Sequence, residues 1–333
     1  MHPREALFGA GEARPALPVC DHYAGVEVRM RKSLELQAEL GPVFDVTLDA
    51  EDGAPVGGEA EHAALIAELL TGPHNRFGRV GARLPSVDHD AFETVAETIV
   101  GRAGARLAYL MVPKVRGVAD LQRAAETVDA LARDADLDRE IPLHALVETH
   151  GALREVQALA AHPRIESLSF GLMDFVSEHR GAIPQAGMSA AGQFEHPLVV
   201  RAKLEIAAAC HGFGKTPSHC VVTEFKDTRA LQTAATRACR EFGYTRMWSI
   251  HPAQVRTIVE AFAPTVAEVD QAVEILSAAQ AADWAPIRHR DTLHDRASYR
   301  YFWHVVERAQ RTSSADAPAL PAEVRRAWFG AAA

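Results

Sequence analysis

The sequence LHALVET (residues 143–149), followed by SFGLMD (residues 169–174), decides the predicted fold. Each segment is a short apolar run that leads directly into a carboxylate, Glu148 in the first and Asp174 in the second. Such runs are typical of strands buried on both faces of a parallel sheet. Parallel strands end at the same edge, so we expect the two carboxylates to lie side by side there. Two hard oxygen donors favour a divalent cation, above all Mg²⁺, whereas either acid alone could simply cap the next helix.

Strand and helix patterns alternate along most of the chain. Strands are predicted at residues 16–20, 43–49, 79–84, 107–113, 142–148, 167–171, 218–223 and 247–251. Helical patterns follow them at residues 26–40, 59–70, 88–99, 118–133, 151–161, 197–210, 228–242 and 252–262. This alternation implies parallel strands joined by crossover helices. Eight strands in about 250 residues predict an α/β fold, a closed (β/α)8 TIM barrel over residues 16–262. A doubly wound open sheet is the alternative if a weak strand such as 16–20 does not form.

The two ends of the chain differ from the predicted barrel. Residues 1–15 mix charge, Gly and Pro, which predicts a flexible lead-in. Residues 263–333 predict a C-terminal helical appendage, a lid or an oligomerisation segment, with helices at 264–282 and 299–309 joined by a polar linker. The second of these helices carries an aromatic stripe. We expect this stripe to pack on the barrel or on a neighbouring subunit rather than to bind a ligand.

Composition excludes several classes of function. The chain has 333 residues, of which 48% are hydrophobic and 24% charged, as in ordinary globular proteins. Its formal net charge of −9 argues against a nucleic-acid surface and against an anionic membrane partner. We find neither a signal-peptide pattern nor an apolar run long enough for a membrane helix. The four cysteines show no CxxC spacing, so we expect reduced, buried thiols and a cytoplasmic protein.

Charged residues stand at the ends of seven successive predicted strands. In a TIM barrel these ends meet at the C-terminal face, where chemistry collects. A charged residue at any one strand end could simply be exposed to solvent at the edge of the barrel. Charged residues at seven successive strand ends favour one polar site. The residues are Asp49, Glu51 and Asp52 after the second strand, then Arg83, Lys114, Glu148, Asp174, Glu224 and His251.

Roles follow from the chemistry of these side chains. The predicted metal ligands are Glu148 and Asp174. The acidic run 49–52 is too rich for every member to bind metal directly, so some would hold metal-bound waters. The cation would chelate a 2-oxo or 2-hydroxy acid and stabilise the enolate or alkoxide that forms when a C–C bond is broken or made.

Three basic residues are given different roles. Arg83 offers a bidentate fork for a substrate carboxylate. Lys114 is expected to be a structural partner of the acidic run. His251 precedes Pro252, so it either starts a helix with its ring bonded to the backbone or touches substrate.

An ordered set of short strings resembles the citrate lyase beta-subunit family of the HpcH/HpaI aldolase/citrate lyase superfamily, which includes malyl-CoA and citramalyl-CoA lyases. The strings are Leu48-Asp49-Ala50-Glu51-Asp52, Pro113-Lys114-Val115, Val147-Glu148-Thr149, Phe170-Gly171 with Asp174, and Ile250-His251-Pro252-Ala253-Gln254. The resemblance implies a (β/α)8 barrel, usually a homotrimer or hexamer, with Mg²⁺ as cofactor. It also implies cleavage or formation of a C–C bond between a 2-oxo acid and an acetyl-type unit, normally a CoA thioester.

The resemblance also implies roles for single residues. Glu148 and Asp174 would bind the metal, and Arg83, Gly171 and Asp174 would contact substrate. An aspartate from the C-terminal lid of an adjacent subunit would act as acid/base. Its counterpart here is Asp295, with Asp291 as the fallback, in the polar linker before the last predicted helix.

The chain departs from the family pattern in its first strand. Family members carry Arg-Ser and Pro-Gly there, whereas this chain reads LPVCDHY at residues 17–23. This change leaves open whether a CoA thioester is used. The alternative function is a non-catalytic, metal-dependent oxo-acid-binding protein or complex subunit on the same barrel. Phosphoenolpyruvate-type chemistry would need a Gly-rich phosphate loop after the seventh or eighth strand, and we find none.

Overall fold

The computed structural model describes residues 1–9, 16–54, 56–313 and 319–330. The chain divides into two compact units. Residues 17–261 form one unit, and residues 1–16 with 262–333 form the other.

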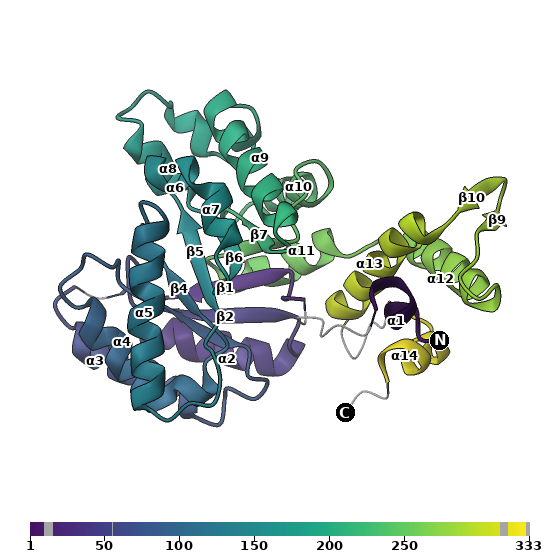
Figure 1. The fold of residues 1–333 in the computed structure, drawn as a ribbon. Helices are drawn as coiled ribbons and strands as arrows, with labels where there is room; N and C mark the ends of the chain where they lie inside the picture. The colour runs from purple at the N-terminus through teal and green to yellow at the C-terminus, as the bar shows by residue number, and fades with distance from the viewer. Residues whose placement is uncertain (10–15, 55, 314–318, 331–333) are drawn as a thin grey trace. The chain divides into compact units, whose positions relative to one another are not determined.

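The larger unit is a closed barrel of parallel strands (Figure 1). Neighbouring strands pair in sequence order, and β1 pairs with β8 to close the ring, with Cys20 opposite Met247. This closure confirms the predicted (β/α)8 barrel and excludes the doubly wound open sheet. The strands are β1 (Cys20–Ala24), β2 (Phe44–Asp49), β3 (Val80–Arg83), β4 (Leu110–Val112), β5 (Leu143–Val147), β6 (Ile165–Phe170), β7 (Thr216–His219) and β8 (Arg246–Ser249).

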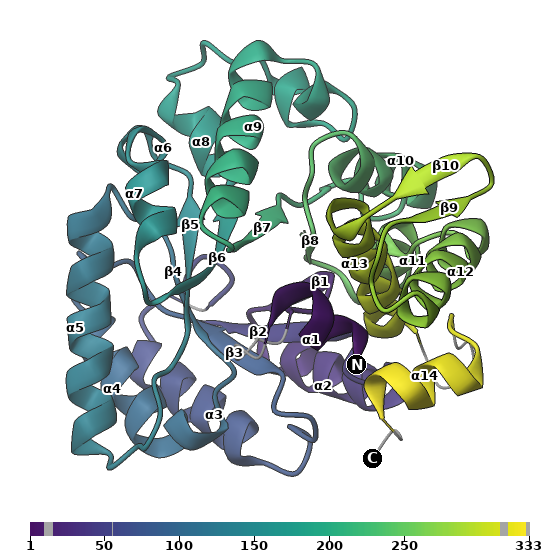
Figure 2. The same cartoon turned by 45° about the vertical axis from the view of Figure 1, so that its right-hand side comes forward.

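Helices surround the strands, as Figure 2 shows from a second direction. Their starts follow local sequence signals: α9 begins at Pro197, and the Asp227 side chain caps α10 by accepting the N–H of Ala230. The helices of this unit are α2 (Glu27–Leu40), α3 (Glu59–Thr71), α4 (Phe92–Ala103), α5 (Val118–Asp134), α6 (His150–Arg154), α7 (Val156–Ala161), α8 (Leu172–Glu178), α9 (Pro197–Gly212), α10 (Thr228–Arg240) and α11 (Pro252–Phe262).

Two strands lie away from their predicted positions. The first was expected at 16–20 and forms at Cys20–Ala24, and the seventh was expected at 218–223 and forms at Thr216–His219. The true β1 was missed because it contains Asp21 and His22, which are fully buried. The apolar residues that follow β7 leave the ladder, and the Val222 carbonyl accepts the Gln254 amide of α11 at 2.8 Å instead.

The N-terminal half of the barrel interior is filled by a buried ionic network. The Arg246 guanidinium donates to Asp45 at 2.6 Å and lies 3.0 Å from an Asp21 carboxylate oxygen. Thr47 donates to Asp21 at 2.7 Å. Next to this network lies a buried apolar cluster of Tyr23, Met111, Leu146, Val221 and Trp248.

The second unit is helical, with one small hairpin. It contains α1 (Pro3–Phe8), α12 (Val266–Ala281), β9 (Ile287–His289), β10 (Thr292–His294), α13 (Arg296–Thr312) and α14 (Ala322–Phe329). Its core includes Trp303, Trp328 and Leu7. A helix at Pro3–Phe8 differs from the flexible lead-in that we expected over 1–15, whose residues 10–15 lie outside the described part of the chain. The expected polar linker is a hairpin with Arg290 and Asp291 at positive φ in its two-residue turn.

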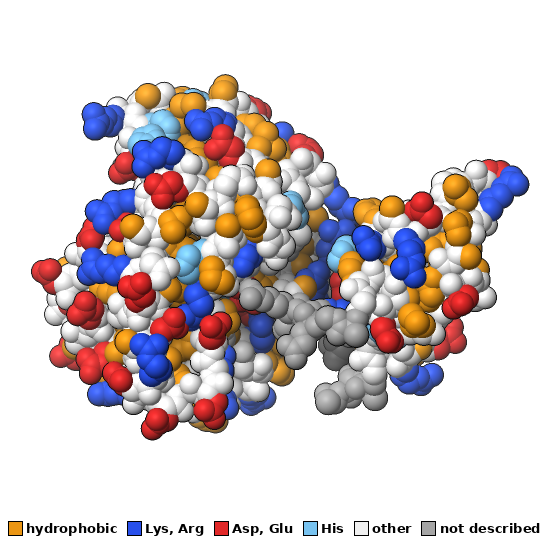
Figure 3. Space-filling view, viewed as in Figure 1, with side chains coloured by type: hydrophobic (Ala, Val, Ile, Leu, Met, Phe, Trp, Pro, Cys, Tyr) orange, Lys and Arg blue, Asp and Glu red, His pale blue; other side chains and the backbone are white. Residues whose placement is uncertain are grey.

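Surface composition agrees with the sequence. On the face of the barrel unit seen in Figure 3, acidic and basic side chains are interspersed. Within the described residues, no helix combines the length and the apolar character needed to cross a bilayer. Cys20, Cys210 and Cys220 are buried as predicted, whereas the prediction is wrong for Cys239, which is half-exposed.

Candidate metal and substrate site

Glu148 lies at the C-terminal end of β5 and is almost fully buried, with 2% of its surface exposed. Its Oε1 accepts the backbone N–H of Lys114 at 2.7 Å, and Lys114 adopts a left-handed φ of 52° at this position. Burial and, after it, the nearby Asp174 carboxylate together raise the pKa of the Glu148 carboxyl to about 8, against the opposing effect of the Lys114 N–H. Burial and the second acid both disfavour the ionised form of Glu148, so a cation bound here would stabilise the negative charge.

Asp174 lies in the first turn of α8, directly after β6, and is half-buried. It lines the same cavity as Glu148, a space of about 340 Å³ that also contacts Lys114, Arg116, Thr149, His150, Gly151 and Glu178. Gly171, which connects β6 to α8, leaves room for the Glu148 carboxylate, because a Cβ there would lie 2.1 Å from Glu148 Oε2. The two predicted metal ligands therefore face one cavity, and Gly171 acts through the space that it leaves.

The acidic run after β2 is organised differently, around Arg83. Asp49 and Arg83 are directly opposite in the β2–β3 register. Arg83 Nε and Nη2 donate to the two Asp49 carboxylate oxygens at 2.7 and 2.6 Å. The backbone N–H groups of Glu51 and Gly53 add bonds to the same carboxylate at 3.0 and 2.9 Å. Asp49 is thus held entirely by protein donors.

Protein carboxylates contact much of the Arg83 guanidinium, and a substrate-binding role for Arg83 stays a prediction. Its Nε–Nη2 edge is occupied by Asp49, and Nη1 lies 2.9 Å from Glu51. Burial alone would lower the pKa of the guanidinium, but the charges of Asp49 and Glu51 raise it, so Arg83 stays cationic. The Arg83 Cζ atom lies over the Tyr23 ring, 5.4 Å from the ring centroid. Only the outer Nη1–Nη2 edge remains for a substrate.

Lys114 closes the acidic run on its other side. Its ammonium donates to Asp52 at 2.9 Å and also contacts Glu51. Burial acts against the ammonium charge, but the bonds to Glu51 and Asp52 raise the pKa of Lys114. The hydrogen bond from Lys114 outweighs the effect of burial on Asp52, so the pKa of Asp52 is lowered. For Glu51 the effect of burial is larger than that of its cationic neighbours, so the pKa of Glu51 is raised. The structure therefore places Lys114 as the structural partner of this run.

The remaining predicted residues lie at helix starts or in turns. His251 is exposed, stacks on Phe225 and accepts the Ala253 N–H at 3.2 Å, as a residue that starts α11. Asp295 caps α13 by accepting the N–H of Ala297 at 3.0 Å. Asp291 sits in the β9–β10 turn and bonds to Arg288. These contacts describe what each side chain does within its own unit, and an acid/base role for Asp295 or Asp291 stays a prediction.

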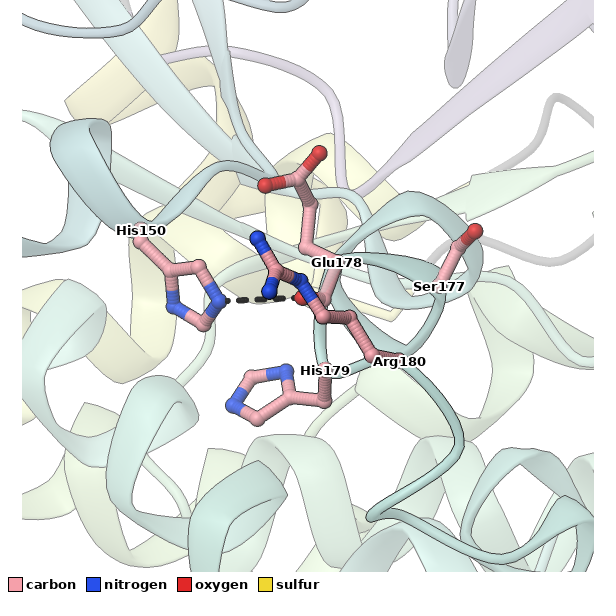
Figure 4. A pocket seen from close by; sticks show the side chains of 5 residues that line it. All are labelled: His150, Ser177, Glu178, His179 and Arg180. Carbon is pink, nitrogen blue, oxygen red and sulfur yellow. Dashed lines mark hydrogen bonds between the residues drawn. The ribbon is translucent and has the colours of Figure 1, made fainter.

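Sequence reasoning missed a second cavity, of about 470 Å³, that borders the first (Figure 4). The two cavities share His150 and Glu178 in their walls. Its other lining residues are Ser177, His179 and Arg180. The signal was present in the sequence, since the polar residues that line this cavity follow the two predicted metal ligands by only two to six positions.

The donor set at the strand ends suits Mg²⁺ better than a transition metal. The described residues contain no cluster of three or more His, Cys, Asp or Glu side chains arranged to hold a metal ion. Mg²⁺ is commonly bound through one or two carboxylates, with waters and substrate oxygens completing its octahedron. Glu148 and Asp174 match that pattern, and the raised Glu148 pKa indicates a place where a cation would be favourable.

Comparison with known proteins gives a consistent result. A family model described as HpcH/HpaI aldolase/citrate lyase matches residues 43–252. The L-malyl-CoA/beta-methylmalyl-CoA lyase of Cereibacter sphaeroides is 26% identical over 286 residues, which cover 81% of this chain and 88% of that protein.

Solved structures agree. A crystal structure described as a citrate lyase from Burkholderia xenovorans LB400 is 53% identical, covers 99% of both chains and has a TM-score of 0.84. The protein CitE from Mycobacterium tuberculosis, crystallised with magnesium, acetoacetate and coenzyme A, is 18% identical and covers 89% of this chain and 99% of that chain, with a TM-score of 0.68. At that level of identity the likeness concerns the fold.

Proposed function

Because the chain belongs to the HpcH/HpaI aldolase/citrate lyase family, we propose that it is a magnesium-dependent carbon–carbon lyase or aldolase. Its substrate is a short 2-oxo or 2-hydroxy acid, used alone or as a CoA thioester. The observation that carries the proposal is that two carboxylates, the buried Glu148 and the half-buried Asp174, line one cavity at the C-terminal strand ends. Active sites of TIM barrels lie at this face.

In the proposed reaction each group has a separate task. Glu148 and Asp174 hold Mg²⁺, which when bound polarises the oxo and carboxylate oxygens of the substrate. Gly171 has no side chain, and the Glu148 carboxylate occupies the space that a Cβ at this position would fill. Arg83 offers its outer Nη1–Nη2 edge, while Asp49 fixes the guanidinium plane through a bidentate bond. Tyr23 and Trp248 belong to a buried apolar cluster of the barrel and stack with their ring centroids 4.7 Å apart.

Relatives support the acyl partner. The name L-malyl-CoA/beta-methylmalyl-CoA lyase refers to CoA thioesters, and a structural neighbour was crystallised with coenzyme A. We therefore propose a CoA thioester as one product or co-substrate. From the family resemblance of the sequence we also propose a homotrimer or hexamer as the working assembly. In this assembly Asp295 of an adjacent subunit would be the acid/base, with Asp291 as the fallback.

A non-catalytic oxo-acid-binding protein is the second candidate. One observation favours it: the Asp295 carboxylate already caps α13 through the Ala297 and Ser298 N–H groups. An acid used for capping is less available for proton transfer. Mg²⁺ and oxo-acid binding without turnover would distinguish this function from the lyase.

A thermal-shift panel of 2-oxo acids and acyl-CoA esters, with and without Mg²⁺, tests the proposal. We expect at least one acid to raise the melting temperature only when Mg²⁺ is present, because binding to the folded state stabilises it. Glu148→Ala should keep the fold and lose both this shift and turnover. Full activity of that variant in chelator-treated buffer would show that the metal assignment is wrong.

A further inference from the structure

We propose that Tyr23 is a positioning residue for the proposed reaction: its ring supports the Arg83 guanidinium, so that the outer Nη1–Nη2 edge of Arg83 meets a substrate carboxylate in one fixed orientation. The inference rests on the proposed function, because it takes a 2-oxo or 2-hydroxy acid as the ligand of that edge. It assigns a role to LPVCDHY, residues 17–23, the segment in which this chain departs from the family pattern.

Tyr23 lies near the C-terminal end of β1 and is 7% exposed. Its ring stacks on that of Trp248 from β8, with the centroids 4.7 Å apart and the planes 17° from parallel. Both rings belong to the buried apolar cluster that also contains Leu146 of β5 and Val221, which follows β7. Because these residues come from different sides of the ring of strands, the Tyr23 side chain points into the barrel. A large ring packed in this way keeps one orientation.

The Tyr23 ring supports Arg83 where no acid does. Asp49 accepts from Nε and Nη2 at 2.7 and 2.6 Å, and Glu51 lies 2.9 Å from Nη1, so both acids hold the guanidinium through its nitrogens. The Cζ atom lies over the Tyr23 ring, 5.4 Å from the ring centroid, within the range of cation–π attraction. Arg83 is only 8% exposed, and such attraction is stronger when the cation is desolvated. The ring therefore adds a contact that the two acids do not make.

The supported guanidinium lies near the predicted metal ligands. Burial and the Asp174 carboxylate raise the pKa of Glu148, and the charge of Arg83 acts against them. An electrostatic effect of this kind weakens with distance, which indicates that Arg83 and Glu148 are neighbours at the strand ends. An acid bound at this end of the barrel therefore meets a guanidinium whose orientation is already fixed.

The Tyr23 hydroxyl and the Tyr23 ring make different contributions. The hydroxyl oxygen is buried, and it has no hydrogen-bond partner among the residues that the structure describes. A buried hydroxyl without a partner costs free energy rather than contributing it. The proposed role therefore belongs to the ring, which phenylalanine also supplies.

Three variants test the role of the ring. Tyr23→Leu removes the ring, Tyr23→Phe keeps it, and Val221→Ala opens the same apolar cluster from the β7 side, whereas Arg83 is on β3. Isothermal titration with pyruvate and with oxaloacetate, each in the presence of MgCl₂, measures acid binding, and titration with MgCl₂ alone measures metal binding. Tyr23→Met, which fills more of the space without a ring, replaces Tyr23→Leu if that variant does not fold.

We expect Tyr23→Leu to weaken acid binding by about tenfold, as loss of a buried cation–π contact predicts. Its affinity for MgCl₂ should stay within about twofold of wild type, because the predicted metal ligands lie on other strands and the Arg83 charge is kept. Tyr23→Phe should bind both acids as the wild type does. Val221→Ala should also keep acid binding, although its cavity lowers stability in urea denaturation.

Chemical modification of Arg83 gives a readout that needs no substrate. Phenylglyoxal reacts with guanidinium groups, and peptide mass spectrometry follows Arg83 against the exposed Arg154 as internal reference. We expect Arg83 to react several-fold faster in Tyr23→Leu than in Tyr23→Phe, because the guanidinium has lost the contact with the ring. Arg154 should react at the same rate in both variants.

The outcomes separate this inference from the proposed function. Equal acid affinity in Tyr23→Leu and Tyr23→Phe would overturn the positioning role and leave the metal site in place. Equal losses in Tyr23→Leu and Val221→Ala would also overturn it, because the effect would then belong to the cluster as a whole. If the ring protects Arg83 but neither acid binds more tightly with MgCl₂ than without it, the proposed function fails, and the assignment of Tyr23 to substrate binding fails with it.

Discussion

Two groups of acids at the same end of the barrel differ in what faces them. After β2, Asp49 receives both arms of Arg83, and Glu51 and Asp52 contact Lys114. After β5 and β6, Glu148 and Asp174 face a cavity, and the one protein donor to Glu148 among the described hydrogen bonds is a neutral backbone N–H. The first group is complete without a ligand, and the second is not. An acid that already has a cationic side chain as partner has a structural role, whereas an acid without one is a candidate metal ligand.

Removal of one carboxylate from each group should give the largest contrast. Glu148→Gln keeps the shape and loses the charge, so we expect Mg²⁺-dependent turnover to fall by about 10³-fold, as loss of metal-assisted catalysis predicts. Asp52→Asn is the matched variant and should stay within a few-fold of wild type. Steady-state kinetics with a titration of Mg²⁺ measures both. Similar losses in the two variants would contradict the distinction between the groups.

The cation of the paired group should matter most for stability. Arg83→Gln leaves Asp49 buried without its partner, and we expect the free energy of unfolding to fall by about 3 kcal/mol. Arg116→Gln removes an exposed ion pair with Asp120 and should leave the free energy of unfolding close to that of the wild type. Urea denaturation followed by circular dichroism compares the two. Equal costs would mean that the Asp49 pair contributes no more than a surface contact.

A single methyl group at position 171 can change the space around the Glu148 carboxylate. Gly171→Ala places a Cβ 2.1 Å from Glu148 Oε2, so the carboxylate must move, and we expect Mg²⁺ affinity to fall by roughly 10–100-fold. Gly101→Ala, on α4 with open space around it, should instead stabilise the fold by about 0.5–1 kcal/mol and leave the metal unaffected. Isothermal titration with MgCl₂ and thermal melts distinguish them. Unchanged affinity in Gly171→Ala would place the ion away from Glu148.

A further effect concerns pH. The pKa of Glu148 is raised to about 8, so below that pH the carboxyl is protonated in the metal-free protein and must lose its proton to bind Mg²⁺. Affinity should therefore rise with pH up to about 8, by about tenfold per unit at most, and level off above it. Titrations between pH 6 and pH 9 test the sign. Asp52→Asn should keep the same slope, and a slope that is flat below pH 8 would rule out proton release from Glu148.

Part of the site was predictable because it follows from local sequence. Glu148 and Asp174 were identified because each ends an apolar run, and parallel strands must bring such ends to one face. The role of Arg83 was not predictable, since its bond to Asp49 depends on the register between β2 and β3. The register between neighbouring strands depends on how the whole barrel closes, so the sequence of one strand alone does not predict it.

The same limit applies to the ends of the chain. The sequence of 1–15 resembles a loose lead-in, yet α1 packs with α13, almost three hundred positions away, where Arg300 donates to the Leu7 carbonyl at 3.2 Å. Short polar segments form helices when a distant surface buries their few apolar residues. The hairpin β9–β10 was missed because its turn is formed by Arg and Asp rather than by glycine.

By itself, the sequence determined the alternation of strands and helices and the eightfold barrel, and it predicted two acids as ligands of Mg²⁺, because apolar periodicity and strand-end position are local properties. Only the tertiary structure decided which acids already have cationic partners, that Gly171 makes room for Glu148, and that Arg180 borders a second cavity. Those features depend on side chains from different strands meeting in space, and the closure of the barrel alone sets which of them meet.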